Sequence, residues 1–501
     1  MSENLAAIFF ARASSHAEKP ALIWNDRAVA TFGDLPMMAG HYAAALAELG
    51  VHAGDRVMVK TENSPAFIYT YLAVLASGAI FVPLNPAYTA PEVTLLIEDA
   101  APVLLVHASA TPVPDEAQCP LRRVTLEPDG SGTLSELALS LPSRLEVLEC
   151  GADDLACILF TSGTTGRPKG AMLTHRNLSG NVAALYETWR FSEADSILHC
   201  LPMFHAHGLF VALHLGLYSA ATLHLLPKFT VDAVIERLGQ VSVFMGVPTF
   251  YARLLADVRF DRTLAGPLRL FISGSAPLLP SVFDEIEQRT GHRILERYGM
   301  TEAVMITSNP YEQAGRMPGT VGFPLPGVEL RVVGSGGQEL PAGEVGEIEI
   351  RGPNLCKGYW RRPDATAESF HADGFFRTGD TGFKDAEGRV TIAGRSKDLI
   401  ISGGFNVYPA EVEMLLAEVS GVKDIAIIGV PHPDFGEAVV AVITVEEGVF
   451  SMDALEQAAH EKLARFKQPK VVHVMDEFPR NAMGKILKNV LRERYTRSFT
   501  G

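Results

Sequence analysis

The sequence predicts an α/β protein with three parts: a large N-terminal domain with mainly parallel sheets, a small antiparallel β subdomain, and a small α+β C-terminal domain. Its 501 residues exceed what one ordinary hydrophobic core supports. From about residue 20, short apolar runs alternate with helical patterns, which favours parallel sheets. Between about residues 320 and 395, polar and apolar residues alternate between Gly and Pro turns, which is typical of antiparallel strands.

The expected elements follow one another in that order. Apolar runs of four to six residues bounded by turns predict strands, whereas longer spans with helical spacing predict helices. The strands are expected at residues 79–84, 103–106, 156–160, 196–200, 221–225, 241–245 and 268–273, with helices at 67–77, 231–238 and 279–289. The antiparallel strands are expected at residues 328–333, 346–351 and 389–392.

From about residue 396 the tail reads strand, helix, strand, helix, a compact unit of roughly 100 residues. The predicted domains are therefore residues 1–394 and 395–501.

Composition narrows the class of protein. With 47% hydrophobic and 20% charged residues the chain is close to an average soluble globular protein. The net charge of −15 opposes nucleic acid and anionic membranes, so neither is expected as a partner. Two uncharged stretches, residues 63–91 and 198–227, contain prolines or histidines and are interpreted as buried core.

Targeting and cysteine usage favour a cytoplasmic location. The N-terminus lacks the basic region of a signal peptide. The five cysteines lie far apart without a CxxC pair, which favours reduced thiols in the cytosol over disulfides or a zinc site.

The sharpest local signal is a Ser/Thr/Gly-rich loop at residues 161–170, directly after an apolar run. Its glycines permit close backbone approach, and its hydroxyls and exposed N–H groups suit phosphate oxygens, with positive charge from Arg167 and Lys169. It does not match the Walker A pattern. The competing interpretation is an ordinary turn. The phosphate candidates are Thr161, Ser162, Gly163, Thr164, Thr165, Gly166 and Lys169.

Four further segments carry weaker signals: residues 295–302, 376–380, 394–409 and 479–485. Glu302 is a candidate Mg²⁺ ligand, because carboxylate oxygen suits a hard cation. Asp380 on a turn suits ribose hydroxyls. Taken singly, Glu302 also fits a helix cap, Asp380 an Asx turn, and Lys485 a solvated loop lysine.

Together, in this order, the five motifs resemble the adenylate-forming superfamily of acyl-CoA synthetases, firefly-type luciferases and peptide-synthetase adenylation domains. The resemblance covers essentially the whole chain. It implies an AMP-forming acid–thiol ligase that uses ATP, Mg²⁺ and coenzyme A, and whose partners are small molecules.

The resemblance also implies roles for individual residues. The loop at 161–170 holds the β- and γ-phosphates, the residues after 273 pack on adenine, and Lys485 bridges the substrate carboxylate and the α-phosphate. The implied nucleotide contacts are Gly274, Ser275, Ala276, Pro277 and Tyr298 for adenine, Thr301 for the α-phosphate, Glu302 for magnesium, and Asp380 and Arg395 for ribose.

In this superfamily the small domain rotates between the two half-reactions. The resemblance places the pivot at Lys397. After rotation Lys485 leaves and the segment at residues 403–409 enters, where the glycines give room for the pantetheine arm. The implied CoA contacts are Gly403, Gly404, Phe405 and Tyr408.

The acyl segments, residues 203–209, 244–250 and 295–298, look most like the malonyl-CoA synthetase branch. Arg297 stands where fatty-acyl and aryl ligases commonly have a small residue, and an arginine there suits the far carboxylate of a dicarboxylic acid. Malonyl-specific relatives often carry Thr where Ala206 stands, so methylmalonate is also expected. The other implied lining residues are the gate His205, the wall Met305, Gly246 and Ser275.

Several alternatives stay open at this stage. Arg297 also fits a structural salt bridge with an acidic neighbour. The chain also fits a ligase for short-chain or aryl monocarboxylates, an adenylation enzyme that loads a carrier protein, a luciferase-type oxidase, or a non-catalytic nucleotide sensor. Lys485 on an exposed loop is a plausible target of a regulatory lysine acetyltransferase.

Overall fold

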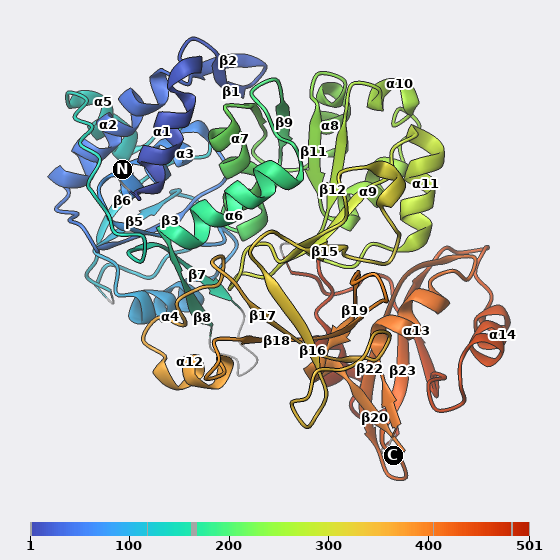
Figure 1. Cartoon of the computed structure of the whole chain (residues 1–501). Coiled ribbons are helices and arrows are strands. Elements are labelled where there is room, and N and C mark those ends of the chain that lie inside the picture. Colours follow the sequence, from blue (N-terminus) through green and yellow to red (C-terminus); the bar gives the residue numbers. More distant parts are fainter. Residues whose placement is uncertain (1–2, 118, 162–167, 404, 482–483, 500–501) are drawn as a thin grey trace.

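The computed structural model describes residues 3–117, 119–161, 168–403, 405–481 and 484–499, which form four sheets (Figure 1). Two large sheets make up the N-terminal part, and the predicted α/β class with antiparallel sheets and a C-terminal unit is confirmed. The first sheet has the order β6 (Arg122–Thr125), β5 (Leu104–His107), β3 (Arg56–Lys60), β4 (Ile80–Pro83), β7 (Leu155–Thr161) and β8 (Lys169–Thr174). Its pairs are parallel except for β7 with β8.

The second sheet carries most of the site, because several of its parallel strands end at one edge. Its order is β15 (Phe323–Pro324), β14 (Thr307–Ser308), β13 (Leu295–Tyr298), β12 (Leu270–Ser273), β11 (Val243–Gly246), β9 (Ser196–His199), β10 (Thr222–Leu225), β1 (Pro20–Trp24) and β2 (Arg27–Thr31). The strands from β1 to β13 run parallel, and β2, β14 and β15 are antiparallel additions.

Helices cover these sheets. They are α1 (Leu5–Ala13), α2 (Asp34–Glu48), α3 (Pro65–Ala76), α4 (Ala90–Ala100), α5 (Thr133–Ser140), α6 (His175–Thr188), α7 (His214–Ser219), α8 (Val231–Leu238), α9 (Pro248–Leu255), α10 (Arg262–Ala265), α11 (Pro280–Thr290) and α12 (Pro363–Ser369). A π-helical segment, η2 (His207–Leu213), has no counterpart among the expected elements. Such segments concentrate at functional sites.

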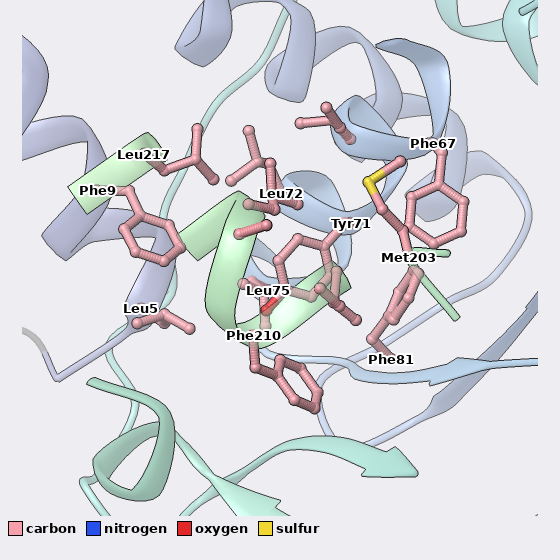
Figure 2. Packing of buried hydrophobic residues seen from close by; sticks show 14 of the residues in the cluster. Leu5, Phe9, Phe67, Tyr71, Leu72, Leu75, Phe81, Met203, Phe210 and Leu217 are labelled. Carbon is pink, nitrogen blue, oxygen red and sulfur yellow. The ribbon is translucent and has the colours of Figure 1, made fainter. Parts of the chain in front are cut away.

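Helix α3 explains the first uncharged stretch. Ser64 caps it by accepting a hydrogen bond from the Phe67 N–H at 3.2 Å, and Pro65 suits the first turn. Tyr71 packs edge-on against Phe81 of β4, with ring centroids 4.9 Å apart (Figure 2). Residues 63–84 of the stretch are therefore core, as predicted, whereas residues 85–91 reach the surface. In the described part of the chain, no helix combines the length and the apolar character that a membrane span needs.

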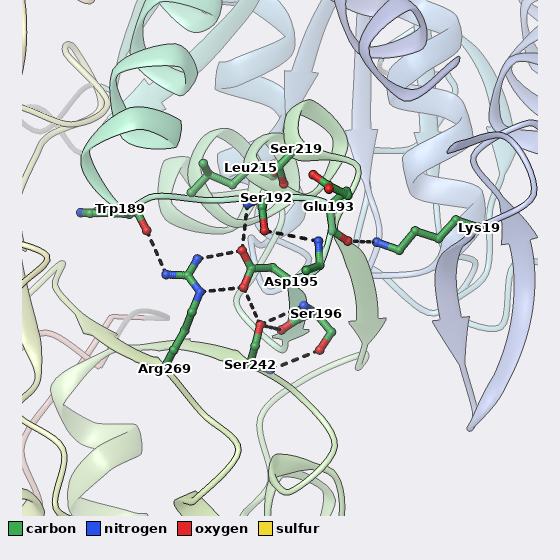
Figure 3. A network of polar contacts seen from close by, with 11 residues as sticks. Lys19, Trp189, Ser192, Glu193, Asp195, Ser196, Leu215, Ser219, Ser242 and Arg269 are labelled. Carbon is green, nitrogen blue, oxygen red and sulfur yellow. Dashed lines mark hydrogen bonds and ion pairs between the residues drawn. The ribbon is translucent and has the colours of Figure 1, made fainter. Parts of the chain in front are cut away.

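A polar network pins the amino ends of three strands of the second sheet (Figure 3). Asp195 precedes β9, Ser242 precedes β11 and Arg269 precedes β12. Arg269 donates from Nε and Nη2 to the two Asp195 oxygens at 2.7 and 2.8 Å, and Ser242 Oγ donates to Asp195 at 2.7 Å. The carboxyl ends of the same strands lead into the candidate site, so this network fixes the strands from the opposite end.

We expect Asp195→Asn to lower stability by about 3 kcal/mol, because it leaves the Arg269 guanidinium without its counter-charge in a largely buried place. Burial alone would raise the pKa of Asp195, but hydrogen bonds and the charge of Arg269 outweigh it and lower the pKa. A lowered pKa stabilises the fold above the unfolded value of about 3.9, and that contribution disappears as the pH falls. Calorimetry should show a large Tm difference at pH 7 that narrows in acid.

The control for Asp195→Asn is Asp153→Asn, which removes the exposed partner of Arg176 at 3.3 Å. Exposed pairs contribute about 0–1 kcal/mol. Equal losses of Tm in the two variants would contradict the role of the Asp195 network.

The antiparallel sheet and the C-terminal unit follow each other without a long linker. The former has the order β16 (Glu329–Val333), β17 (Gly346–Arg351), β18 (Phe376–Lys384) and β19 (Val390–Arg395). The latter contains β20 (Ile400–Ser402), β21 (Phe405–Val407), β22 (Val422–His432), β23 (Gly436–Val445) and β24 (Val471–Val474), with α13 (Pro409–Leu416), α14 (Met452–Lys462) and α15 (Lys488–Tyr495). The expected division between residues 394 and 395 falls at the end of β19 and stays a prediction.

Candidate active site

Three elements meet around the carboxylate of Asp380. The cross-strand pairing of β18 with β19 sets Asp380 opposite Arg395, whose Nε lies 2.6 Å from Asp380 Oδ1. Tyr298, at the end of β13, donates its hydroxyl to Asp380 Oδ2 at 2.5 Å. The Asp380 side chain is buried. The structure thus brings together three residues that the sequence placed at the nucleotide, and it holds the carboxylate in a fixed orientation.

Glu302 lies in the turn after β13, where it is almost fully buried. Tyr359 donates its hydroxyl to Glu302 Oε1 at 2.8 Å. Burial raises the pKa of Glu302, and the Tyr359 hydrogen bond opposes this. The described residues contain no group of three or more His, Cys, Asp or Glu that suits a metal ion. One carboxylate beside phosphate oxygens is the usual protein share of a Mg²⁺ site, so Glu302 fits that cation.

The phosphate loop begins and ends on a β-hairpin. Thr161 closes β7, Lys169 opens β8, and the two residues are cross-strand partners. The Lys169 ammonium lies 5.2 Å from the centroid of the Tyr359 ring. The loop candidates Ser162, Gly163, Thr164, Thr165 and Gly166, with Arg167, lie outside the described residues.

Lys485 approaches this cluster from the C-terminal unit. A Cβ on the neighbouring Gly484 would lie 2.9 Å from Thr249 Oγ1, so the Lys485 turn rests against α9 of the N-terminal part. The residue is exposed overall. Desolvation, followed by the charge of Arg395, lowers the pKa of its ammonium group, and Asp380 acts in the opposite direction. The charges of Arg395 and Asp380 therefore act on Lys485 from the antiparallel sheet.

The loop after β12 contacts both η2 and β13. Ser275 adopts a left-handed backbone with φ of 70°, which is strained for a residue other than glycine, and its Oγ lies 3.4 Å from His207 Nδ1. A Cβ on Gly274 would lie 2.4 Å from Arg297 Cζ. Gly274 thus leaves the room that the guanidinium occupies. Ala276 and Pro277 continue this loop, and Thr301 lies in the turn that carries Glu302.

Arg297, in β13, is a buried cation beside that loop. It is 4% exposed, and its Nε and Nη2 have no hydrogen-bond partner among the described residues. Burial lowers its pKa to about 9, while Tyr251 and Glu296 act in the opposite direction. Arg297 remains a cation at neutral pH.

Among the described residues, Arg297 forms no salt bridge, which argues against the structural alternative. The neighbouring Glu296 points its Oε1 to the Leu278 N–H at 3.2 Å. Burial raises the pKa of Glu296 to about 8. Glu296 is therefore largely neutral at pH 7, and the positive charge of Arg297 has no close ionic partner in the described part of the chain.

Small and apolar residues occupy the other positions that the sequence predicts for the acyl substrate. Ala206 and Met305 are buried, and a Cβ on Gly246 would lie 3.1 Å from the Tyr251 ring. Burial, followed by the charge of Arg297, lowers the pKa of His205 to about 4, so this histidine is neutral at pH 7. The Arg297 nitrogen atoms that lack a partner in the described part of the chain thus suit an anionic group.

The residues that are predicted to contact CoA lie in the C-terminal unit. Phe405 is 58% exposed and stacks on Phe466 at 4.7 Å, and the Gly403 N–H donates to the Phe435 carbonyl at 2.9 Å. Tyr408 precedes α13, Gly404 lies outside the described residues, and Lys397 lies in the short η4 turn (Ser396–Asp398). None of the recorded hydrogen bonds or ring contacts of the described CoA residues reaches Asp380 or Arg297.

Two residues of the site had no signal in the sequence. Tyr359 lies in a short run between β17 and α12, in which neither periodicity nor spacing marks one aromatic residue. Glu296 precedes Arg297 in a strand. The raised pKa of its carboxyl group depends on burial, which the sequence alone does not reveal. His207 contacts Ser275, and its Nε2 has no partner among the described residues.

Comparisons with known proteins agree with this geometry. The family profile "AMP-binding enzyme" matches residues 9–360, and its C-terminal domain matches residues 411–485. The malonate–CoA ligase of Arabidopsis thaliana is 37% identical over 88% of this chain and 78% of its own. A feruloyl-CoA synthase of Amycolatopsis sp. is also 37% identical, over 97% of both chains.

Among solved structures, ATP-bound MatB from Rhodopseudomonas palustris is 44% identical and covers both chains completely, with a TM-score of 0.96. The apo form of the same protein reaches a TM-score of only 0.85. The arrangement of the present structure is thus closer to the ATP-bound form.

Proposed function

The chain belongs to the AMP-binding enzyme family, and on that premise we propose that it is a malonyl-CoA synthetase that also accepts methylmalonate. It is an AMP-forming acyl-CoA ligase that uses ATP and CoA. The proposal as to the acid rests on one observation: Arg297 is buried and cationic, and has no ionic partner among the described residues. A buried charge left in this state calls for an anionic ligand.

The first half-reaction joins the acid to the nucleotide. A carboxylate oxygen attacks the α-phosphorus, the bond from that phosphorus to the bridging oxygen breaks, and pyrophosphate leaves. Both reactants are anions, so catalysis consists mainly of positioning and charge neutralisation. Glu302 would hold Mg²⁺, which would supply part of that neutralisation when bound. Lys485 contributes a positive charge next to the Asp380–Arg395 pair, which we assign to the ribose.

The second half-reaction transfers the acyl group to CoA. The thiol sulfur bonds to the acyl carbon, the bond from that carbon to the phosphate oxygen breaks, and AMP leaves while the thiol proton passes to solvent. We assign the division at 394/395 as the domain boundary and Lys397 as the pivot. The position of Lys485 and the likeness to an ATP-bound relative support a state ready for the first half-reaction. The hairpin with Gly403 and Phe405 would enter in the second.

Three residues indicate which class of carboxylic acid the site binds. Arg297 suits the distal carboxylate of a dicarboxylic acid, neutral His205 adds no competing cation, and Ala206 leaves space next to the acid's second carbon. Monocarboxylic acids would leave Arg297 without a partner in a desolvated site, which selects against them.

We expect Ala206→Thr to narrow the substrate range. The added hydroxyl and methyl groups occupy space beside Arg297, so kcat/KM for methylmalonate should fall about tenfold relative to that for malonate. Steady-state assays with both acids measure this ratio, and Ala212→Ser, near the end of η2, is the control. An unchanged ratio would remove Ala206 from the acyl pocket.

Pyrophosphate exchange over a panel of acids tests the proposed function. Malonate and methylmalonate should support exchange, whereas acetate, benzoate and ferulate should support little. The similarity to a feruloyl-CoA synthase makes ferulate the most informative competitor. Preference for ferulate or benzoate would overturn the dicarboxylate assignment, and a carrier protein outperforming free CoA as acceptor would identify a loading enzyme.

Two finer features belong to the proposal. Lys485 lies on an exposed turn, so a lysine acetyltransferase has access to it, and acetylation would remove the charge that the first half-reaction uses. The five cysteines are free, which supports a reducing compartment such as the cytoplasm.

A further inference from the structure

A segment outside the regular sheets connects two parts of the site. The bridging segment, residues 354–360, lies between β17 and α12 and is hydrogen-bonded to β8, the strand that leaves the phosphate loop. The Met172 N–H donates to the Gly358 carbonyl at 2.9 Å, the Lys357 N–H to the Met172 carbonyl at 2.9 Å, and the Trp360 N–H to the Gly170 carbonyl at 2.8 Å. The segment is thus fixed to the phosphate-loop hairpin.

The bridging segment also holds the turn that carries Glu302. Asn354 Nδ2 donates to the Ala303 and Met305 carbonyls, both at 2.8 Å. The Cys356 N–H donates to the Glu302 carbonyl at 2.7 Å, and Tyr359 donates its hydroxyl to the Glu302 carboxylate at 2.8 Å. Backbone and side chain of Glu302 are therefore both held from this one segment.

The turn itself is strained. Val304 has φ of 55°, a left-handed conformation that is unfavourable for a β-branched residue. Its carbonyl packs against Gly299, where a Cβ would lie 2.1 Å from it. Such a conformation persists only where the surroundings impose it, and it is found at sites whose geometry matters.

We propose that Tyr359 is a positioning residue that couples Lys169, the first residue of β8, to Glu302, the proposed cation ligand. Its hydroxyl aims the Glu302 carboxylate, while its ring, with the Lys169 ammonium 5.2 Å from the centroid, sets the position of the lysine that leaves the loop. The inference rests on the proposed nucleotide function. A hydrogen bond from a buried neighbour to a metal-ligating carboxylate commonly changes metal affinity 10- to 100-fold.

Binding of Mn²⁺, a paramagnetic substitute for Mg²⁺, tests this without turnover. Electron paramagnetic resonance measures free Mn²⁺ in the presence of protein and α,β-methylene-ATP. Tyr359→Phe keeps the ring and loses the hydroxyl, so Mn²⁺ affinity should fall about tenfold while metal-free binding of the analogue stays within twofold. Tyr359→Leu also loses the ring, so metal-free binding should weaken as well, because the Lys169 contact is lost.

Two comparisons separate positioning from folding. Tyr42→Phe removes another buried tyrosine hydroxyl, which pairs with Ser135 Oγ at 2.8 Å far from the site, and should leave Mn²⁺ affinity unchanged. In a Glu302→Ala background, Tyr359→Phe should cause no further loss, because its target is gone.

The outcomes are distinct. Wild-type protein that fails to bind Mn²⁺ with the analogue would count against the proposed nucleotide function. Wild-type binding together with unchanged affinity in Tyr359→Phe, or additive losses in the double variant, would overturn the coupling role of Tyr359 alone.

Discussion

Lys485→Ala should slow formation of the acyl adenylate at least 100-fold while transfer of the acyl group from supplied malonyl adenylate to CoA stays within about threefold. The reason is electrostatic. In the proposed mechanism Lys485 neutralises the negative charge that increases at the α-phosphate as pyrophosphate departs, and the charges of Arg395 and Asp380 already act on this lysine. Pyrophosphate exchange measures the first half-reaction, and release of AMP from the supplied adenylate measures the second.

Three control variants sharpen the Lys485 experiment. Lys485→Arg keeps a positive charge and should recover part of the exchange rate, whereas Lys485→Gln, which resembles acetyl-lysine, should behave like alanine. Lys462→Ala removes an exposed lysine paired with Glu418 at 2.8 Å in the same unit and should affect neither half-reaction. Equal losses in both half-reactions for Lys485→Ala would contradict a moving C-terminal unit.

The hydrophobic pattern was sufficient to predict the bounds of an element where its buried residues follow regular helical or strand spacing. Helix α8 (Val231–Leu238) and strand β17 (Gly346–Arg351) have the expected bounds, since one shows helical spacing and the other strict alternation. Other elements, such as β11, begin or end one or two residues from the expected position, where turn residues compete with the strand pattern. The π-helical η2 was missed because its apolar residues carry no period that separates it from an ordinary helix.

Only those residues of the site that belong to recognisable sequence motifs could be predicted. Asp380, Arg395 and Tyr298 belong to separate segments, and the structure brings their side chains into contact. The role of Tyr359 could not be predicted from the sequence. It depends on the pairing of residues 354–360 with β8, a long-range contact that no local sequence pattern indicates. The electrostatic state of Glu296 also depends on tertiary burial and not on sequence spacing.

Arg297→Met should lower kcat/KM for malonate by about 100- to 1000-fold, because a buried charge-assisted pair with a carboxylate contributes several kcal/mol to binding. Acetate, which has no second carboxylate, should be used as well as before or better, since its binding no longer leaves a buried cation without a partner. Steady-state kinetics with malonate and acetate give the ratio of the two kcat/KM values, which tests this prediction. Arg297→Lys keeps the charge but not the two-pronged geometry and should fall between the two.

A glycine gives an independent route to the same result. A Cβ on Gly274 would lie 2.4 Å from Arg297 Cζ, so Gly274→Ala should displace the guanidinium and also lower malonate use, although Arg297 is intact. Gly180→Ala in α6 is the matched control, because its nearest neighbour, Pro353 Cβ, would lie 4.0 Å away. If both Arg297→Met and Gly274→Ala kept the wild-type preference for malonate over acetate, the cation would be structural. Loss of that preference in both, with Gly180→Ala unaffected, would mean that the selectivity for dicarboxylic acids depends on where one guanidinium lies.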